Sequence, residues 1–392
     1  MDTSASATGD LPAGAARAAG KPALTVTDLD GQVPPGIGPQ LDELYGSIYS
    51  TLDQFELDGA LDGASTFAVT QDGRPKSLLL YRREGSLVSV LNRQVALPRE
   101  EVERFAYSIF EKYAGVSAIR LDAVQADLRG TRHPWHGFHC AEDIVARLPG
   151  SADGFHAALG RNMRETVRRY TNKVRRSHPD FRLEFHDDAG FDEEQVAALY
   201  ALHCQRIGTR NMVSNVTPER FRRIMAMVRR RGMVAVATIG GRVAGGLILW
   251  RTGTHYVMRI IAHDSRYDEL KLGTVCCYLT MLECIARGAT HFHFMAGRML
   301  YKTRLLGVEQ GYDQVVIYRN RFAMLRHARL AGGAVLRGAL RELRVWLQDA
   351  ERDGNPRAQP LLRCVRAWRH ARALLRARRH PAEQRVPASC DA

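Results

Sequence analysis

The sequence predicts an α/β (α+β) protein with two similar halves, and three observations support this prediction. Short apolar segments of strand length alternate with amphipathic helical segments along most of the chain. The order helix, helix, three-strand meander, helix, strand occurs twice, which indicates an internal duplication of one α/β unit. The 392 residues, 45% of them hydrophobic, are enough for one large domain or two packed domains.

The first half is expected between residues 39 and 150. Its expected elements are a helix over 39–57, strands over 65–70, 77–81 and 87–91, a helix over 100–113 and a strand over 118–123. The segment 125–152 has the composition of a loop. Residues 1–38 are rich in Ala, Gly, Pro and Thr and are expected to form a disordered lead-in without the layout of a signal peptide.

The second half is expected over 151–320 and begins with the clearest helix of the chain, over 153–177. One face of this helix carries an apolar stripe from Phe155 to Val174, and basic residues cover the rest. The elements expected after it are a strand over 181–186, helices over 191–206 and 219–230, strands over 233–238, 243–251 and 256–262, a helix over 273–287, and strands over 290–294 and 314–318.

The net charge of +14 is concentrated in three helical segments. The C-terminal extension, 321–392, is expected to be helical and carries a net +10, and the helices 161–177 and 219–231 carry +6 and +5. The remaining chain is therefore mildly acidic, which argues against a protein that coats nucleic acid. No ladder of basic and aromatic residues indicates nucleic-acid reading either.

The segment 361–379 has an apolar stripe flanked by arginines. This pattern suits an interfacial helix on an anionic membrane, and it suits equally a helix that packs on its own protein or on a partner. Peripheral contact with the inner membrane through this segment is therefore one hypothesis. No apolar run reaches the roughly 18–20 residues that a membrane-spanning helix needs.

The seven cysteines show no CxxC pair and no zinc spacing, so neither a disulfide scaffold nor a metal site is expected. A reducing cytoplasm is the expected location. His291 and His293 alternate on one strand and share a face, and without a third ligand we expect them to be structural.

The first candidate segment for chemistry runs from Ile261 to Gly273. A buried strand ends, a polar loop with His263 and Asp264 follows, and Gly273 opens a helix. Free backbone N–H groups at a helix start can hold a phosphate, and a glycine allows close approach. This element predicts an anion site, although such loops often have only a structural role.

The second candidate segment runs from His291 to Lys302. Here a strand ends, a turn at Ala296-Gly297 follows, and the pair Tyr301-Lys302 comes just beyond it. Lys302 is one of only six lysines in the chain, which draws attention to it.

The order of these features resembles the GNAT superfamily, and specifically its cellulose-biosynthesis-type acetyltransferase branch, which is related to Fem-type aminoacyl transferases. The features that carry the resemblance are the strand pair around Gly240-Gly241, the strand into His263-Asp264, the Gly273 helix, the Gly288 turn, the strand into Ala296-Gly297, and Tyr301-Lys302. The helix over 159–176 resembles the basic helix that precedes the catalytic half in that branch. Residues 150–310 carry the resemblance, and 40–125 resemble a degenerate first GNAT half. The implied fold is a tandem of GNAT-like domains, each with a mixed, mostly antiparallel sheet flanked by helices, plus the C-terminal helical extension.

The resemblance implies acyl transfer from a thioester to an amine. In this chemistry a backbone N–H at a strand splay polarises the donor carbonyl, a base takes the proton of the ammonium acceptor, and an acid protonates the leaving group. His263 or Asp264 is the expected base, Tyr301 the expected acid, and Lys302 is expected to stabilise negative charge. The structural alternatives are a surface loop position for His263, an Asx-turn cap for Asp264 and a core position for Tyr301.

The resemblance also implies acyl-CoA, with acetyl-CoA foremost, as co-substrate. Leu272, Gly273, Thr274 and Arg298 are the residues expected to bind it. The family's phosphate loop has several small residues, whereas here only Gly273 and Thr274 fit. The family strand that usually ends in Asp-Phe-Gly ends here in Phe294-Met295-Ala296-Gly297, without the acid.

The leading hypothesis is therefore a cytoplasmic N-acyltransferase that acts on an amine of a sugar, amino acid or envelope precursor. Its acceptor would be a small molecule or a glycan precursor in a pathway of envelope polysaccharide. One alternative is a Fem-like transferase that uses aminoacyl-tRNA, the one case in which nucleic acid is expected as a partner. The other is a catalytically degenerate GNAT fold that serves as a component of an envelope-polysaccharide pathway.

Overall fold

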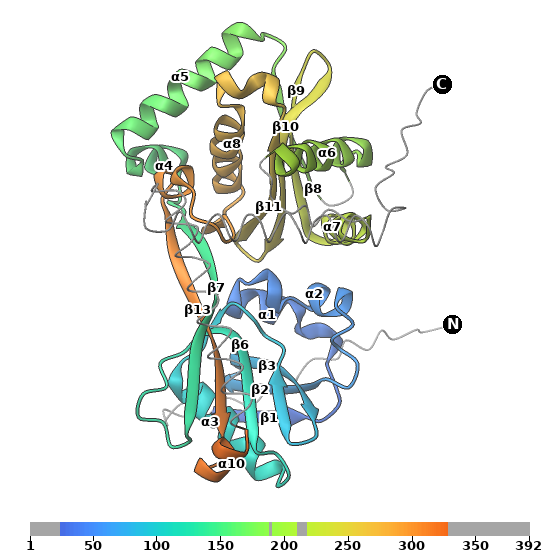
Figure 1. Ribbon diagram of the computed structural model, residues 1–392, viewed down its shortest axis with the longest axis vertical. Coiled ribbons are helices and arrows are strands. Elements are labelled where there is room, and N and C mark those ends of the chain that lie inside the picture. The colour runs from blue at the N-terminus through green and yellow to red at the C-terminus, as the bar shows by residue number, and fades with distance from the viewer. Residues whose placement is uncertain (1–23, 188–189, 210–217, 328–392) are drawn as a thin grey trace, which may run out of the picture. The chain divides into compact units, whose positions relative to one another are not determined.

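The computed structural model describes residues 24–187, 190–209 and 218–327, and Figure 1 shows its elements. We define the first repeat as residues 24–147. It contains β1 (Leu24–Leu29), η1 (Pro35–Ile37), α1 (Gly38–Tyr45), η2 (Ile48–Ser50), α2 (Leu52–Leu57), β2 (Ser65–Gln71), β3 (Arg74–Glu84), β4 (Leu87–Val90), β5 (Val95–Ala96), α3 (Arg99–Lys112), β6 (Ala118–Gln125) and β7 (Trp135–Arg147). Two helices, α4 (Ala152–Ala158) and α5 (Arg161–Ser177), follow it.

We define the second repeat as residues 182–318. It contains β8 (Arg182–Asp187), α6 (Glu193–Thr209), α7 (Pro218–Arg231), β9 (Gly232–Ile239), β10 (Arg242–Thr252), β11 (His255–His263), η3 (Ser265–Leu270), α8 (Leu272–Ala286), β12 (His291–His293), α9 (Leu300–Arg304) and β13 (Gly307–Tyr318), and α10 (Arg321–Arg326) follows. Apart from the short extra elements, both repeats have the order strand, two helices, three strands, helix, two strands. The predicted fold class, a tandem of α/β units with mostly antiparallel sheets flanked by helices, is confirmed.

The strands of both repeats form one sheet with the order β1-β2-β3-β4-β6-β13-β7-β12-β11-β10-β9-β8, and β5 pairs with β6. Most neighbours along this order are antiparallel, but β4 runs parallel to β6, as the short β5 also does, and β11 runs parallel to β12. In each repeat this parallel pair joins the third strand of the meander to the strand that follows the helix. The two pairs are thus equivalent positions in the two repeats.

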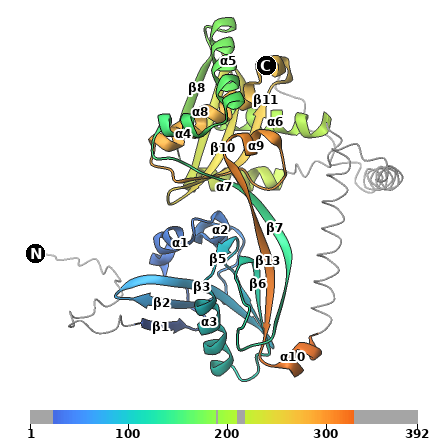
Figure 2. The same ribbon diagram turned by 90° about the vertical axis from the view of Figure 1, so that its left-hand side faces the viewer.

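The last strand of each repeat pairs with the other repeat. β13 pairs with β6, with Tyr318 opposite Ala118, and β7 pairs with β12, with Val145 opposite His293. β7 and β13 also pair with each other along their length, and Figure 2 shows them side by side between the repeats. The repeats therefore exchange their final strands reciprocally, so neither repeat has a complete sheet of its own.

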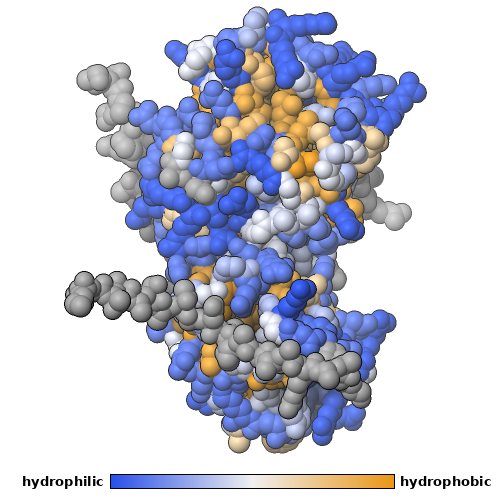
Figure 3. Space-filling view, turned by 180° about the vertical axis from the view of Figure 1, so that it is seen from behind, coloured by the Kyte–Doolittle hydropathy of each residue, from blue (hydrophilic) through white to orange (hydrophobic). Residues whose placement is uncertain are grey.

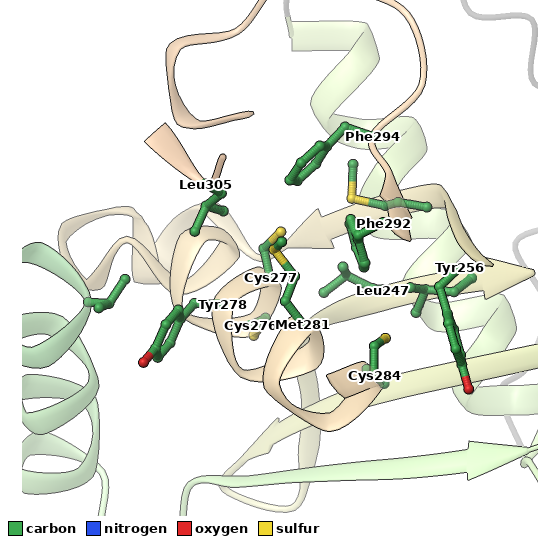
Figure 4. Packing of buried hydrophobic residues seen from close by; sticks show 14 of the residues in the cluster. Leu247, Tyr256, Cys276, Cys277, Tyr278, Met281, Cys284, Phe292, Phe294 and Leu305 are labelled. Carbon is green, nitrogen blue, oxygen red and sulfur yellow. The ribbon is translucent and has the colours of Figure 1, made fainter. Parts of the chain in front are cut away.

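Both faces of the sheet are covered in the second repeat. One core lies under α8 and α5 and contains Leu247, Cys277, Met281, Phe292 and Phe294, whose side chains converge in Figure 4. The other core lies under α6 and α7 on the opposite face. The helix α5 contributes the buried residues of its predicted apolar stripe and leaves its arginines outside, as its sequence period requires.

Ion pairs connect α7 with the helices of the first repeat. Arg231 donates to Asp42 at 2.9 Å and to Asp53 at 2.6 Å, and Arg230 donates to Glu56 at 2.8 Å. The side chain of Arg231 is only 14% exposed, so this contact is shielded from solvent more than an ordinary surface pair. Part of the predicted basic surplus of α7 thus contacts acidic residues of the same chain.

Three expectations about the first 160 residues are wrong. Residues 24–38, expected within the disordered lead-in, contain β1, whose backbone pairs with β2 while Leu24 and Val26 stay exposed. The expected loop at 125–152 contains β7. The single helix expected over 39–57 is interrupted at Gly46, whose φ of 54° lies in the left-handed region and ends α1.

Two further element boundaries differ from expectation. The helix expected over 153–177 is two helices, because Leu159 and Gly160 adopt extended backbone between α4 and α5. The strand expected over 314–318 begins at Gly307. The C-terminal extension beyond residue 327, including the stripe 361–379, lies outside the described residues. Within the described ranges, no helix is both long and apolar enough to cross a membrane.

Candidate active site

A splay between β11 and β12 defines the centre of the candidate site. The two strands pair only from His255 to Val257 and from His291 to His293. Beyond Val257, β11 continues beside β10 as far as His263, while no strand of the described residues pairs with its other edge. The backbone N–H and C=O groups along this edge are therefore available to a ligand that lies in the splay.

A β-bulge lies at the start of the splay. Ile248 of β10 faces Ile260, and the next residue of β10, Leu249, faces Met258, so Arg259 is the extra residue of β11. Such a bulge redirects the backbone groups and the side chain of the extra residue. Here it coincides with the point where β11 loses its parallel partner.

The side chain of Arg259 lies beside Trp250 and Tyr49, which belong to or pack against the core under α6 and α7. It donates to the Tyr49 hydroxyl at 3.4 Å and lies 4.4 Å from the centre of the Trp250 ring, while Nε is buried without a hydrogen-bond partner. No carboxylate of the described residues forms an ion pair with it. Burial lowers the pKa of Arg259, and Arg220 and Arg223 of α7 lower it further. An uncompensated buried cation of this kind is favourable where an anionic ligand binds.

Lys302 holds the turn that follows β12. Its side chain is 4% exposed, and Nζ donates to the carbonyl oxygen of Met295 at 2.9 Å and to that of Ala296 at 3.1 Å. Met295 has a φ of 62°, a conformation that a non-glycine residue adopts only when its surroundings enforce it. Burial lowers the pKa of Lys302 to about 8. The ammonium group predicted to stabilise charge on a substrate thus binds two backbone carbonyls beside the splay.

Tyr301, on α9, is the predicted acid. Its ring packs edge to face against Phe294 at 6.2 Å between centroids, and within the described ranges its hydroxyl has no hydrogen-bond partner. Burial raises the pKa of this hydroxyl well above its ordinary value, so Tyr301 keeps its proton at neutral pH. A protonated hydroxyl that is not otherwise engaged is suited to donate to a leaving thiolate.

The start of α8 carries three of the residues predicted to bind the donor. Leu272 and Gly273 are buried in its first turn, and the N–H of Thr274 donates to the Lys271 carbonyl at 2.9 Å. In the described part of the chain, no backbone carbonyl accepts from the N–H groups of Leu272 and Gly273. A Cβ on Gly273 would lie 2.8 Å from His263 Nδ1, so this glycine makes room for the imidazole ring.

The two predicted bases are engaged with neighbouring side chains. His263 Nδ1 lies 3.3 Å from an Arg206 nitrogen and must accept, because arginine only donates; Nε2 then donates to Asp268 at 2.8 Å. Asp264 caps η3 by accepting from the Arg266 N–H at 2.9 Å, in agreement with the Asx-turn alternative. The side chain of Arg266 lowers the pKa of Asp264 further below its ordinary range, so this carboxylate is a weak base.

Arg298, the fourth predicted donor-binding residue, forms a bidentate pair with Glu309 of β13, at 2.7 and 2.9 Å. The structure therefore places Tyr301 and Lys302 beside the splay, and it places His263 with Gly273 at the end of β11. Arg259 and Tyr49 were not predicted from the sequence as candidate site residues. A lone arginine within the apolar strand Tyr256–Ala262 was the available signal for Arg259, whereas nothing local marked Tyr49.

Two hollows are present on the described surface. A cavity of about 130 Å³ lies between the repeats beside the splay and is lined by Tyr49 and Val257 among others. A hollow of about 310 Å³ between α5, β8 and α8 is lined mainly by Phe181, Phe185 and Leu279. Figure 3 shows that apolar surface gathers on the second repeat, in the upper half of that view. The larger hollow also has Arg175 and Glu283 in its lining, but of these two hollows the smaller one contains Val257, where the splay begins, and is therefore the one considered for chemistry.

Comparisons with known proteins agree with this fold. Residues 161–303, from α5 to α9, match the family model described as "Acetyltransferase (GNAT) domain". The structure of FemX has a TM-score of 0.53 at 10% identity, with 73% of this chain and 96% of that chain covered. The second repeat is thus similar to a GNAT acetyltransferase domain, and the chain has a GNAT acyltransferase fold.

Two further solved structures are similar at lower scores. A conserved protein of unknown function from Bacteroides thetaiotaomicron has a TM-score of 0.47 at 11% identity, with 75% of this chain and 100% of that chain covered. A tandem GNAT protein from the clavulanic acid biosynthesis pathway has a TM-score of 0.33 at 13% identity, with coverages of 75% and 98%. No curated protein sequence matches this chain.

Proposed function

We propose that this protein is an N-acyltransferase that takes an acyl group from acyl-CoA, with acetyl-CoA the first candidate, and transfers it to an amine. The observation that supports the proposal is the splay at the Arg259 bulge, with the start of α8 beside His263 at the end of β11 and Tyr301 of α9 packed on Phe294, just after β12. A sugar, an amino acid or an envelope precursor is the proposed source of the amine. The cellulose-biosynthesis-type branch remains the proposed relationship within the GNAT acyltransferases.

The residues present fit an acyl-CoA donor. The open edge of β11 offers backbone groups to an extended pantetheine chain, and the first-turn N–H groups of α8 offer donors to its pyrophosphate. The thioester supplies an activated carbonyl. A backbone N–H at the bulge polarises this carbonyl, which stabilises the negative charge that develops during attack. Tyr301 gives its proton to the sulfur that leaves.

Arg259 favours an acceptor that carries an anionic group in addition to its amine. Its guanidinium lies beside the splay and has no carboxylate partner among the described residues. A carboxylate or phosphate of the acceptor would form an ion pair with it. We expect amines that carry such a group to be used in preference to neutral amines. Arg259→Met is expected to raise KM for the anionic acceptor about 10-fold or more, because a hydrogen bond to a charged group contributes about 1.5–3 kcal/mol.

The first experiment is thermal unfolding of the full chain with CoA, acetyl-CoA and longer acyl-CoAs. A bound donor at 100 times its Kd is expected to stabilise the fold by about 2.7 kcal/mol, which raises Tm. Thiol release from the acyl-CoA that binds is then measured with a panel of amines. An unchanged Tm with every acyl-CoA contradicts the donor assignment, and binding of aminoacyl-tRNA with a steep salt dependence supports the Fem-like alternative instead.

Variants then test the site itself. Tyr301→Phe is expected to lower kcat about 100-fold while leaving the Tm shift by acyl-CoA unchanged, since only the proton donor is lost. Tyr107→Phe is the matched control, because this tyrosine is exposed on α3. Donor binding without turnover by any amine would favour the catalytically degenerate alternative.

A further inference from the structure

Four polar side chains from three neighbouring strands meet beside the cavity between the repeats. His293 Nδ1 lies 2.7 Å from Asp143 Oδ2, and His293 Nε2 lies 3.0 Å from His255 Nδ1. The ring of His291 stacks on that of His255 at 4.3 Å between centroids. These residues meet because β12 lies between β7 and β11 in the sheet.

The direction of the hydrogen bonds follows from the chemistry of each group. Asp143 is 2% exposed; its Oδ1 accepts from the Ile144 N–H at 2.7 Å, and as a carboxylate its Oδ2 also accepts. His293 must then donate from Nδ1, and with a neutral imidazole its Nε2 is the acceptor for the Nδ1–H of His255. His255 Nε2 is left as a lone-pair acceptor without a partner among the described residues.

The Nε2 edge of the His255 ring lies against a glycine of the first repeat. A Cβ at Gly46 would lie 2.5 Å from His255 Nε2, so any larger residue would cover this nitrogen. Gly46 and His255 both line the cavity of about 130 Å³. A cavity of this volume holds a few water molecules or the amino end of a larger substrate.

The cavity also lies at the correct place for a reaction in the splay. Val257, the last residue of β11 that pairs with β12, is part of its lining. His291 and His293 occupy the face of β12 opposite Phe292, which packs in the α8 core. An amine in this cavity would thus approach the splay from the face opposite α8.

We propose that this cavity receives the amino end of the acceptor and that the chain His255–His293–Asp143 takes up its proton. This proposal rests on the acyltransferase function proposed above. The ammonium group gives one proton to His255 Nε2, and His255 passes its Nδ1 proton to His293 Nε2. The new N–C bond forms as the C–S bond breaks, and the leaving thiolate takes the proton of Tyr301. The nitrogen then loses its second proton to water, and the Tyr301 phenolate takes a proton back from water. The proton on the histidine chain is released to water.

The positive charge that results from this proton transfer lies on His293, beside the carboxylate of Asp143. Burial, together with His293 and His291, lowers the pKa of His255 to about 3, so a positive charge does not stay there. Transfer of the Nδ1 proton places the charge on His293, which is paired with Asp143. The titratable groups that face His255 are Tyr45, Tyr49, Asp143, His291, His293 and Tyr312. Burial raises the pKa of each of these tyrosines, so they stay neutral at neutral pH.

His255→Asn is the decisive variant, because an asparagine amide can still donate to His293 Nε2 but has no group in place of Nε2 of His255. At pH 7 we expect kcat to fall 100-fold or more, with an unchanged Tm shift by acyl-CoA. The loss is expected to shrink as pH rises toward the pKa of the acceptor amine, since the free amine needs no base. His178→Asn, at a position on the C-terminal end of α5 remote from the cavity, is the control.

Asp143→Asn is the second variant and tests a positioning residue. We expect it to lower kcat at least 10-fold with a smaller change in KM, and to shift the pH profile, because His293 loses its charged partner. A wild-type kcat and pH profile in folded His255→Asn and Asp143→Asn proteins would overturn the proposal while leaving the acyltransferase function intact. A wild-type protein that turns over no acyl-CoA would refute both.

Discussion

Gly273 and His263 contact each other at the start of α8. The Cβ of any larger residue at position 273 would lie 2.8 Å from Nδ1 of His263, closer than real contacts of this kind. The ring of His263 is held by Asp268 and Arg206 and has little freedom to move. The glycine predicted to bind a phosphate is therefore also required by the packing of a side chain of this protein.

Gly273→Ala tests this contact. We expect a loss of stability of about 1–3 kcal/mol, the usual effect of overpacking, and we expect the added change His263→Ala to recover most of it. Urea unfolding of the single and double variants measures the coupling. Gly115→Ala is the matched control, because a Cβ there meets no atom within 4 Å, and it should change stability by less than about 0.5 kcal/mol. Additive effects of the two changes would contradict the contact.

His255 should make the fold sensitive to acid. Its pKa is lowered from 6.5 to about 3, so between these values the unfolded chain binds the proton and the folded chain does not. Stability from this group is therefore lost as pH falls below 6.5. With allowance for solvent, we expect a loss of about 1–2 kcal/mol between pH 7 and pH 4.5 that His255→Asn lacks. Urea midpoints at both pH values measure the difference, and equal slopes in the two proteins would refute it.

Lys302 should give a pH dependence of the same sign in the alkaline range. Its folded pKa of about 8 lies below the ordinary value of 10.5, so between these values the unfolded chain binds more protons. The stability of the wild type should thus rise with pH relative to Lys302→Met, by about 2 kcal/mol between pH 7.5 and 9.5. Guanidinium unfolding at both pH values tests this, with Lys76→Met as the exposed control. A constant difference between wild type and Lys302→Met would disprove the shift.

Ile317 tests the strand exchange. It belongs to β13 yet packs, 4% exposed, in the core formed by α3 and β6 of the first repeat. Ile317→Ala is expected to reduce stability by about 2–4 kcal/mol and to reduce amide protection in β6 and α3. Val308→Ala, at a position 66% exposed on the same strand, should have little effect. Amide hydrogen exchange of the intact chain measures this protection. Loss of protection confined to the second repeat would contradict the strand exchange.

The repeated order of elements could be predicted because it depends on local patterns. The meanders around Asp72-Gly73 and Gly240-Gly241 have apolar strands and turn residues that are visible within a few positions, and the structure confirms them. β7 could not be predicted in this way. Most of its residues are only half buried, and its first half includes Trp135, His136 and Gly137, which show no regular alternation. Its conformation depends on hydrogen bonds to β12 and β13, which lie more than 140 residues away.

The candidate site likewise has features that local sequence patterns predicted and features that depend on the tertiary structure. By itself, the sequence determined the strand–loop–helix element at Gly273, the pair Tyr301-Lys302 and the shared face of His291 and His293, because each depends on spacing within one segment. Only the tertiary structure decided that Lys302 binds the carbonyls after β12 and that Asp143 and His255 complete a chain with His293. The physical reason is the reciprocal strand exchange: β12 lies between strands from two repeats, and no local pattern specifies which distant strand supplies its neighbour.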